Sequence, residues 1–436
     1  MNRTQSLYKQ AKRLIPGGTQ LFSKRPELYL PGLWPAYFSR ARGCTLWDLD
    51  GIRYTDMATM GIGSCLLGYA DVDVNAAVGR VVRDGNMSTL NAPEEVELAK
   101  LLVSLHTWAR MVRFARTGGE AMSVAVRLAR AKTGRDTVLF CGYHGWHDWY
   151  LAANVADRKS LDGHLLPGLD PQGVPRALKG TALPFAYNDV TGFRNRIKAG
   201  KGKIGAVILE SIRGVRPRRD FLEAVQEETR RIGAVLIVDE ITAGFRLAVG
   251  GAHLLFKLKP DIAVFAKGMS NGYPMAAIIG VENVMQAAQD SFVSSTYWTE
   301  RIGPAAALAT IRKIKRLNVP AKLAQTGRDV QEAWRNAAKA HGVEITVAGI
   351  DPLCHFTFGQ GDPLVLKTLF TQCMLDQGFL ASTAFYASYA HGPEKVAAYA
   401  AAVDKAFFTI GKALRGGDAR AWLRGPVCSA GFKRLT

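Results

Sequence analysis

An acidic side chain and an amine each follow a short apolar segment near the middle of the chain. Residues 235–238 (VLIV) precede Asp239, and residues 262–265 (IAVF) precede Lys267 after one intervening alanine. Runs this short and rich in β-branched residues predict buried strands of a parallel sheet. Ligands bind at the carboxyl ends of the strands in open α/β sheets. We therefore expect Asp239 and Lys267 to face one crevice.

This pair of groups matches the needs of one cofactor. Pyridoxal phosphate (PLP) requires an amine for its Schiff base and an anionic carboxylate that keeps its ring nitrogen protonated. The alternative is that Asp239 and Lys267 merely end two strands and pair with surface charges. These two residues alone leave both interpretations open.

Three further segments could complete such a site. Residues 203–210 read as another buried strand with an acid, Glu210, at its end, and a helix over 221–232 connects it to the strand before Asp239. Thr-Gly-Gly at 117–119 precedes a helix over 122–132, an arrangement that presents free N–H groups to a phosphate but also suits an ordinary capping turn.

The strand over 137–140 leads into Tyr143, whose ring could stack on a flat cofactor. His144 and His147 have a spacing that would suit a metal, but no cysteine or carboxylate cluster accompanies them, so we expect no metal site. Residues 151–187 contain four prolines and little periodicity, which predicts a long functional or mobile loop.

Length and composition restrict the class of protein. A chain of 436 residues exceeds the size of one hydrophobic core, so two or more packed units are expected. The first residues lack the apolar stretch of a secretory signal, and no apolar run is long enough to span a bilayer. The six cysteines are scattered without CxxC spacing, as is typical of free thiols in a reducing compartment. We expect a cytoplasmic protein that does not enter the membrane.

The formal net charge is +19. A basic surface can attract nucleic acid, anionic lipid or an anionic substrate. The basic residues are dispersed and no nucleic-acid motif is present, so we expect no nucleic-acid partner. Solubility, or attraction of a phosphorylated or carboxylated small molecule, explains the charge better.

Several motifs, in one order along nearly the whole chain, resemble those of the class III, fold-type-I PLP-dependent aminotransferases, and within them the glutamate-1-semialdehyde 2,1-aminomutase branch. They are PGG at 16–18, WDLDG at 47–51, TGGEA at 117–121, GYHG at 142–145, DEITAGFR at 239–246, GGAH at 250–253 and AKG at 266–268. The resemblance implies an α/β fold: a large domain over 71–315 with a mostly parallel seven-stranded sheet, and a smaller α+β domain. The smaller domain would comprise residues 316–436, joined by the N-terminal segment 1–70.

The resemblance also implies a role for each cofactor-site residue. Lys267 would form the Schiff base and move the proton, and Asp239 would hold the pyridine nitrogen. The other expected cofactor contacts are Ile241 and Tyr143 on the two ring faces, Gly118 and Gly119 on the phosphate, Glu210 near the ring, and Thr296 on the phosphate of the neighbouring subunit of a homodimer.

The departures from the family concern mainly the substrate. The family's Ser-Gly-Thr phosphate turn is Thr117-Gly118-Gly119 here, so one hydroxyl contact is moved or lost. Three substrate positions of the aminomutase fall near Lys24 (or Arg25), Ile62 and Tyr386 in place of arginine, tryptophan and glutamate, and residues 298–302 form an insertion. Lysine cannot form the planar fork of arginine.

These observations predict a PLP-dependent aminotransferase that moves an amino group from an amino donor to a ketone or aldehyde other than glutamate semialdehyde, such as an oxidised sugar or a biosynthetic intermediate. The aminomutase itself, or a related isomerase or racemase, is the alternative. A non-catalytic binding protein of this fold is disfavoured because both Lys267 and Asp239 are retained.

Overall fold

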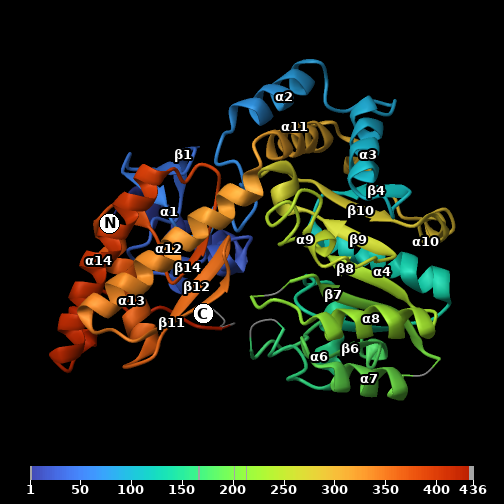
Figure 1. Cartoon of the computed structure of the whole chain (residues 1–436). Helices are drawn as coiled ribbons and strands as arrows, with labels where there is room; N and C mark the ends of the chain where they lie inside the picture. Colours follow the sequence, from blue (N-terminus) through green and yellow to red (C-terminus); the bar gives the residue numbers. More distant parts are fainter. Residues whose placement is uncertain (1, 165–166, 201, 213, 432–436) are drawn as a thin grey trace. The chain divides into compact units, whose positions relative to one another are not determined.

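The computed structural model describes residues 2–164, 167–200, 202–212 and 214–431 (Figure 1). The chain divides into two compact units. One consists of Val72–Pro320, and we call it the large unit. The other combines Met1–Asp71 with Ala321–Thr436, and we call it the small unit. Among the described residues, no helix is both long and apolar enough to cross a membrane.

A seven-stranded sheet forms the centre of the large unit, which confirms the predicted fold class. Its strand order is β4-β10-β9-β8-β7-β5-β6. β10 runs antiparallel to both of its neighbours, whereas the other strands share one direction. The strands are β4 (Met111–Ala115), β5 (Thr137–Cys141), β6 (Ala182–Pro184), β7 (Ile204–Glu210), β8 (Val235–Asp239), β9 (Ile262–Phe265) and β10 (Ala276–Gly280).

Helices cover both faces of this sheet, which explains why its central strands read as continuous apolar runs. In β8, Val235 and Ile237 pack in one core with residues of α4 (Gly118–Thr133), whereas Leu236 and Val238 pack in a second core with residues of α7 and α8. The remaining helices of this unit are α2 (Val72–Arg83), α3 (Pro93–Leu105), α5 (Asp148–Leu151), α6 (Ala153–Ala156), α7 (Val190–Ala199), α8 (Arg219–Arg231), α9 (Ala252–Leu255), α10 (Glu282–Met285) and α11 (Ile302–Arg316).

The segment 151–187 was predicted to be a loop throughout, and this is wrong for part of it. It contains α6, a 3-10 turn over Arg176–Leu178, and β6, which pairs with β5. β6 has three residues and ends in Pro184, so it offers no periodicity to detect. A proline is tolerated there because β6 is the edge strand of the sheet. Residues 165 and 166 lie outside the described part of this segment.

The small unit contains two sheets and four long helices. Its strands are β1 (Phe38–Arg42), β2 (Thr45–Asp48), β3 (Arg53–Asp56) and β13 (Phe379–Leu380) in one sheet, and β11 (Ile345–Ile350), β12 (Leu353–Phe358) and β14 (Ala384–Tyr386) in the other. β2 and β3 pair antiparallel and form a hairpin whose connection contains Asp50 and Gly51.

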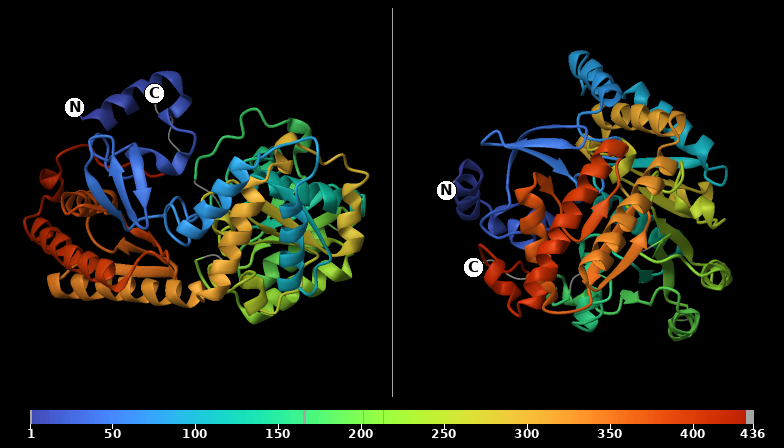
Figure 2. Two further views of the ribbon diagram at one scale, coloured as in Figure 1. Left: turned by 90° about the horizontal axis from the view of Figure 1, so that it is seen from above. Right: turned by 60° about the vertical axis from the view of Figure 1, so that its left-hand side comes forward.

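The helices are α1 (Arg3–Leu14), α12 (Val319–His341), α13 (Pro363–Asp376) and α14 (Pro393–Arg415). Figure 2 shows the ribbon in two further views, in which α12 is orange and α14 is red. Trp334 of α12 donates a hydrogen bond to the hydroxyl of Tyr399 of α14 (2.8 Å).

Candidate active site

The carboxyl edge of the large sheet brings three of the predicted residues together. Glu210 ends β7 and lies opposite Asp239, the last residue of β8. Asp239 in turn pairs with Val264 of β9, and Lys267 follows that strand by two residues. The negative charges of Asp239 and Glu210 both raise the pKa of the Lys267 amine, as expected for groups at the same edge of the sheet.

Asp239 is held by two hydrogen bonds. Its Oδ1 accepts the N–H of Ile241 (2.9 Å), and its Oδ2 lies 2.8 Å from Nδ1 of His144. Both side chains are almost fully buried. The Nε2 atom of His144 is buried and has no hydrogen-bond partner in the part of the chain that the structure describes. The Asp239 carboxylate therefore fixes the orientation of the imidazole through Nδ1, and Nε2 keeps a free hydrogen-bonding position among the described residues.

Lys267 lies in a strained and desolvated position. Its backbone φ is 45°, in the left-handed region that non-glycine residues rarely adopt. Its Nζ donates a hydrogen bond to Oγ1 of Thr242 (2.8 Å). Burial lowers the pKa of the Lys267 amine, and the charge of buried Arg246 adds to that effect, whereas Asp239 and Glu210 oppose it. A lysine with a lowered pKa can act as a nucleophile and as a base near neutral pH.

The Thr-Gly-Gly turn starts α4 beside this pair. A Cβ added to Gly118 would lie 2.8 Å from Cδ1 of Ile241, so a larger residue could not occupy that position without movement. Glu120 Oε2 accepts the N–H groups of Arg116 (2.9 Å) and Thr117 (3.3 Å). The N–H groups of Gly118 and Gly119 belong to the first helical turn and have no partner within the helix. This cradle of free donors at the positive end of a 16-residue helix fits a phosphate group.

Glu210 contacts the segment that carries Tyr143. Its Oε2 accepts the backbone N–H of Tyr143 (3.2 Å), and a Cβ on Gly142 would lie 2.5 Å from the same oxygen. Gly142 also has a φ of 127°, which favours glycine. The Tyr143 side chain is 42% exposed, and burial together with the charges of Asp239 and Glu210 raises the pKa of its hydroxyl. The Tyr143 side chain is therefore close enough to both acids to feel their charges, and it is partly accessible to solvent.

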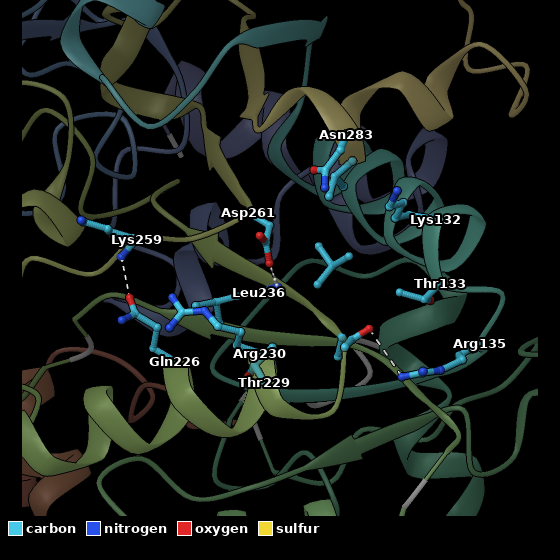
Figure 3. Close-up of a pocket in the computed structure, with 14 residues that line it drawn as sticks. Lys132, Thr133, Arg135, Gln226, Thr229, Arg230, Leu236, Lys259, Asp261 and Asn283 are labelled. Atoms are coloured by element: carbon cyan, nitrogen blue, oxygen red, sulfur yellow. Dashed lines mark hydrogen bonds between the residues drawn. The ribbon is translucent and has the colours of Figure 1, made fainter.

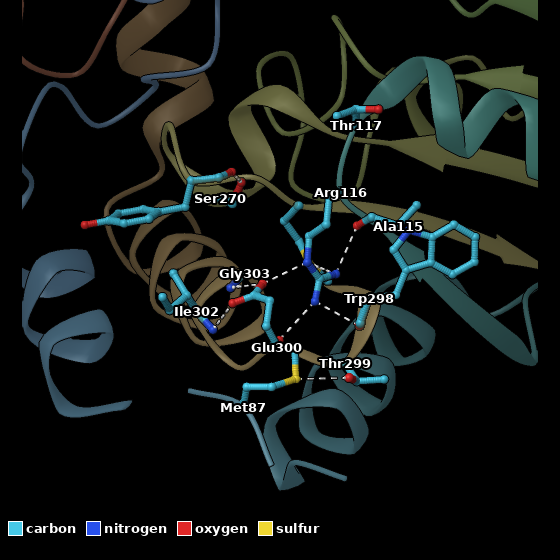
Figure 4. Close-up of polar contacts among 12 residues, drawn as sticks. Met87, Ala115, Arg116, Thr117, Ser270, Trp298, Thr299, Glu300, Ile302 and Gly303 are labelled. Atoms are coloured by element: carbon cyan, nitrogen blue, oxygen red, sulfur yellow. Dashed lines mark hydrogen bonds and ion pairs between the residues drawn. The ribbon is translucent and has the colours of Figure 1, made fainter. Parts of the chain in front are cut away.

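Thr296 begins a short 3-10 turn, Thr296–Thr299, and is exposed. Buried contacts of Arg116 hold the end of this segment (Figure 4). The Arg116 guanidinium pairs with Glu300 Oε1 (2.8 Å) and donates to the carbonyl oxygens of Trp298 (2.8 Å) and Glu300 (2.9 Å). The insertion at 298–302 is thereby anchored to the residue that precedes the phosphate turn.

The substrate residues expected from the resemblance lie in the small unit. Lys24 ends the 3-10 turn Phe22–Lys24, and Ile62 has a φ of 57°. Tyr386 ends β14 and donates its N–H to the carbonyl oxygen of Ala58 (2.7 Å). Within this unit the charge of Lys24 acts on the Cys65 thiol. Contacts of these residues with a substrate stay predictions.

The opposite edge of the sheet also carries a hollow, with a volume of about 420 Å³ (Figure 3). It is lined by the start of β8 and by the basic residues Lys132, Arg135, Arg230 and Lys259. None of the residues assigned to the cofactor lines it.

Several residues of the site were not predicted from the sequence. They are His144, which was considered only as a metal ligand, together with Thr242, Arg246, Arg116 and the buried pair Glu240 and His253. Glu240 Oε1 lies 2.9 Å from His253 Nδ1, which ties DEITAGFR to GGAH. The signal available in the sequence was that each of these residues, except Arg116, belongs to one of the motifs.

Comparisons with known proteins agree with this geometry. A family model described as aminotransferase class-III matches residues 32–381. The chain is 30% identical to a 3-aminobutyryl-CoA aminotransferase of Cloacimonas acidaminovorans, over 89% of this chain and 91% of that protein. It is 32% identical to a glutamate-1-semialdehyde 2,1-aminomutase of Pelotomaculum thermopropionicum, over 93% and 97% of the two chains.

Among solved structures, the PLP internal aldimine form of the Sphingopyxis sp. MTA144 FumI protein superimposes with a TM-score of 0.86 at 27% identity, covering 97% of this chain and 99% of that one. A transaminase with PLP bound gives a TM-score of 0.82 at 24% identity, covering 94% of this chain and 100% of that one, and supports the fold. The chain belongs to the class III aminotransferases, and pyridoxal phosphate is its cofactor.

Proposed function

We propose that this aminotransferase uses Lys267 as its catalytic amine and Asp239 as the partner of the cofactor ring, in transamination between an amino donor and a ketone or aldehyde other than glutamate semialdehyde. The observation that carries the proposal is the meeting of the two groups at one sheet edge. There Lys267 has a lowered pKa and Asp239 is buried and held by His144.

Bound pyridoxal phosphate supplies an aldehyde that condenses with amines and a ring that accepts the electron pair of a broken C–H bond. Lys267 would hold the cofactor, and its Nζ, as a free neutral amine, would take the proton from the substrate carbon. Thr242 orients Nζ through its hydroxyl. In the second half-reaction, Lys267 returns a proton to the carbon derived from the acceptor.

The other residues position the cofactor. Asp239 keeps the proton on the pyridine nitrogen through its negative charge. Gly118 and Gly119 donate backbone N–H groups to the phosphate at the start of α4. Ile241 and Tyr143 would contact the two faces of the ring, and Glu210 fixes the backbone of Tyr143 through the hydrogen bond described above.

The substrate proposal rests on the residues that differ from the aminomutase. By the resemblance, Lys24 (or Arg25), Ile62 and Tyr386 fall near the positions at which that enzyme has arginine, tryptophan and glutamate. A further relative at 32% identity over 81% of this chain is a 2'-deamino-2'-hydroxyneamine transaminase of Streptomyces kanamyceticus, which supports an oxidised sugar as one class of acceptor. The aminomutase activity is the second candidate, favoured by the 32% identity over nearly the full chain.

The first test is the absorbance spectrum of the PLP-loaded protein before and after addition of a panel of amines. We expect a visible band that particular donors bleach, and no such band in Lys267→Ala. A band that no donor changes, combined with solvent deuterium in a product, would instead favour an isomerase or racemase. Conversion of glutamate-1-semialdehyde without any donor would favour the aminomutase. Absence of a visible band in the wild-type protein would contradict the assignment of Lys267.

We also propose a homodimer in which Thr296 reaches the phosphate of the neighbouring site. Large apolar side chains beside Thr296 are exposed, including Phe292 (91%) and Tyr297 (72%), which supports an interface there. Mixed dimers of Lys267→Ala and Thr296→Ala subunits would contain one intact site only if Thr296 acts across the interface. A mixed population without any gain in activity over the two parents would contradict this arrangement.

A cytoplasmic location completes the proposal. All six cysteines are free thiols, and five of them are buried, which fits a reducing compartment. Fractionation of the cells that make the protein tests this location.

A further inference from the structure

The phosphate turn of this chain lacks a hydroxyl, and the structure places another polar group in the vacated position. The second residue of α4 is Gly119, where the resemblance led us to expect a threonine. A Cβ added to Gly119 would lie 3.2 Å from Cδ2 and 3.3 Å from Nε2 of His147. The imidazole therefore occupies the space into which a side chain at position 119 would extend.

The chain is shaped so that His147 can reach this position. A Cβ on Gly145 would lie 3.0 Å from Cα of Gly119, and the φ of Gly145 is 104°. Glycine at 145 thus lets the segment after Tyr143 pass close to the phosphate turn. The ring of Trp146 packs beside the imidazole, with a centroid distance of 4.5 Å. Within the described residues the imidazole nitrogens of His147 have no hydrogen-bond partner.

The electrostatic surroundings of the His147 imidazole are compatible with binding of a phosphate group beside it. Burial lowers the pKa of its imidazole, and the carboxylates of Glu120 and Asp148 oppose that effect. A phosphate dianion beside the ring would favour its protonated form. An imidazole with a free nitrogen, next to unpaired N–H groups at a helix N-terminus, can add a side-chain donor to a backbone cradle.

We propose that His147 replaces the missing hydroxyl of the turn and donates a hydrogen bond from Nε2 to the phosphate of the cofactor. This inference rests on the proposed function, because it takes Gly118 and Gly119 to be the phosphate turn. His147 would thus position the cofactor, and it could do so only because glycine at position 119 leaves space for the imidazole.

The test is a double-mutant cycle on positions 147 and 119, read as affinity of the cofactor-free protein for three ligands. These are PLP, pyridoxine 5'-phosphate, which has no aldehyde, and pyridoxal, which has no phosphate. We expect His147→Ala to weaken binding of both phosphorylated ligands by about tenfold or more, since a hydrogen bond to a charged group contributes about 1.5–3 kcal/mol. Binding of pyridoxal should not change.

The second part of the cycle introduces a side-chain hydroxyl at position 119 through Gly119→Ser. Gly119→Ser alone should crowd the imidazole and weaken binding of the phosphorylated ligands. In the His147→Ala background the serine has room, so the double variant should bind them more tightly than His147→Ala. Independent sites would show additive losses instead. His147→Gln, which keeps a donor without a ring, should retain part of the affinity.

His355→Ala is the matched control. His355 lies in β12 of the small unit, and burial lowers the pKa of its imidazole as well. It should leave all three affinities unchanged, and thermal melting of each cofactor-free variant verifies folding.

Two results would overturn the proposal: a His147→Ala variant that binds the phosphorylated ligands like wild type, or one that loses pyridoxal to the same extent. Because pyridoxine 5'-phosphate requires no Schiff base, its binding is read independently of whether Lys267 performs transamination.

Discussion

Asp239 and Glu240 are adjacent in the sequence, both are buried, and each contacts a histidine, yet the two pairs differ in how completely they are satisfied. Glu240 accepts three hydrogen bonds, from the N–H of Ala252 (3.0 Å) and from the N–H (2.6 Å) and Nδ1 (2.9 Å) of His253. The remaining nitrogen of His253 accepts a hydrogen bond from Trp108 (3.3 Å). Both nitrogens of the His253 ring and both oxygens of the Glu240 carboxylate therefore have hydrogen-bond partners within the protein.

The pair of Asp239 and His144 makes fewer hydrogen bonds within the described residues. Asp239 accepts only one backbone and one side-chain hydrogen bond in the described structure, and Nε2 of His144 has no partner there. Asp239 also faces an amine with a lowered pKa. A carboxylate accepts about four hydrogen bonds. Asp239 makes two in the described structure and Glu240 makes three, so Asp239 retains more capacity for a ligand. The comparison teaches that a complete network stabilises the fold, whereas an incomplete one indicates a binding site.

The largest effect that we expect is a loss of catalytic rate when the charge of Asp239 is removed. Asp239→Asn keeps the size of the side chain and removes the charge, so the rate of the half-reaction with a donor amine should fall by about 10²–10³-fold. Stopped-flow absorbance of the PLP-loaded protein measures this rate. A variant with near wild-type rate would show that the charge of Asp239 is not used.

The next largest effect is a loss of folding stability, which we expect to be greater for substitution of Glu240 than of Asp239. Glu240→Ala leaves His253 and two backbone N–H groups without their acceptor, so we expect a loss of about 3 kcal/mol in the free energy of unfolding. Urea unfolding of the cofactor-free protein, followed by circular dichroism, gives this value. Asp239→Ala is the matched comparison, and a larger loss there than at Glu240 would reverse our assignment of the two roles.

A smaller effect concerns the histidine that holds Asp239. His144→Ala removes one charge-assisted hydrogen bond, so the half-reaction should slow by about tenfold. His144→Asn can still donate to Asp239 and should recover part of the rate. If both variants are equally slow, the contribution of His144 is packing and not hydrogen bonding.

The smallest effect is a pH dependence of the cofactor-free protein. Burial lowers the folded-state pKa of Lys267, so between that pKa and the ordinary lysine value the unfolded chain binds more protons. The free energy of unfolding should therefore rise with pH across this window. Lys267→Met should remove this part of the slope, whereas Lys9→Met, at an exposed lysine, should not. Melting curves at several pH values measure the difference, and equal slopes in all three proteins would contradict a lowered pKa.

Much of the fold and of the cofactor site could be predicted from the sequence. The apolar runs before Glu210, Asp239 and Lys267 are continuous because both faces of the sheet are covered, and each ends at a polar residue. β6 could not be recognised, because three residues of an edge strand that ends in proline carry no pattern. The Arg116 contacts with residues 298–300 were also missed, because they join segments more than 180 positions apart.

The sequence by itself determined the type of sheet, the strand ends that carry acid and amine, and the family, since these depend on local apolar pattern and on motifs. Only the tertiary structure decided which acid retains free hydrogen-bonding capacity, that Thr242 holds Lys267, and that His147 lies in the space beside Gly119. The physical reason is that hydrogen-bond satisfaction, desolvation and the space available to a side chain depend on groups that only folding brings together.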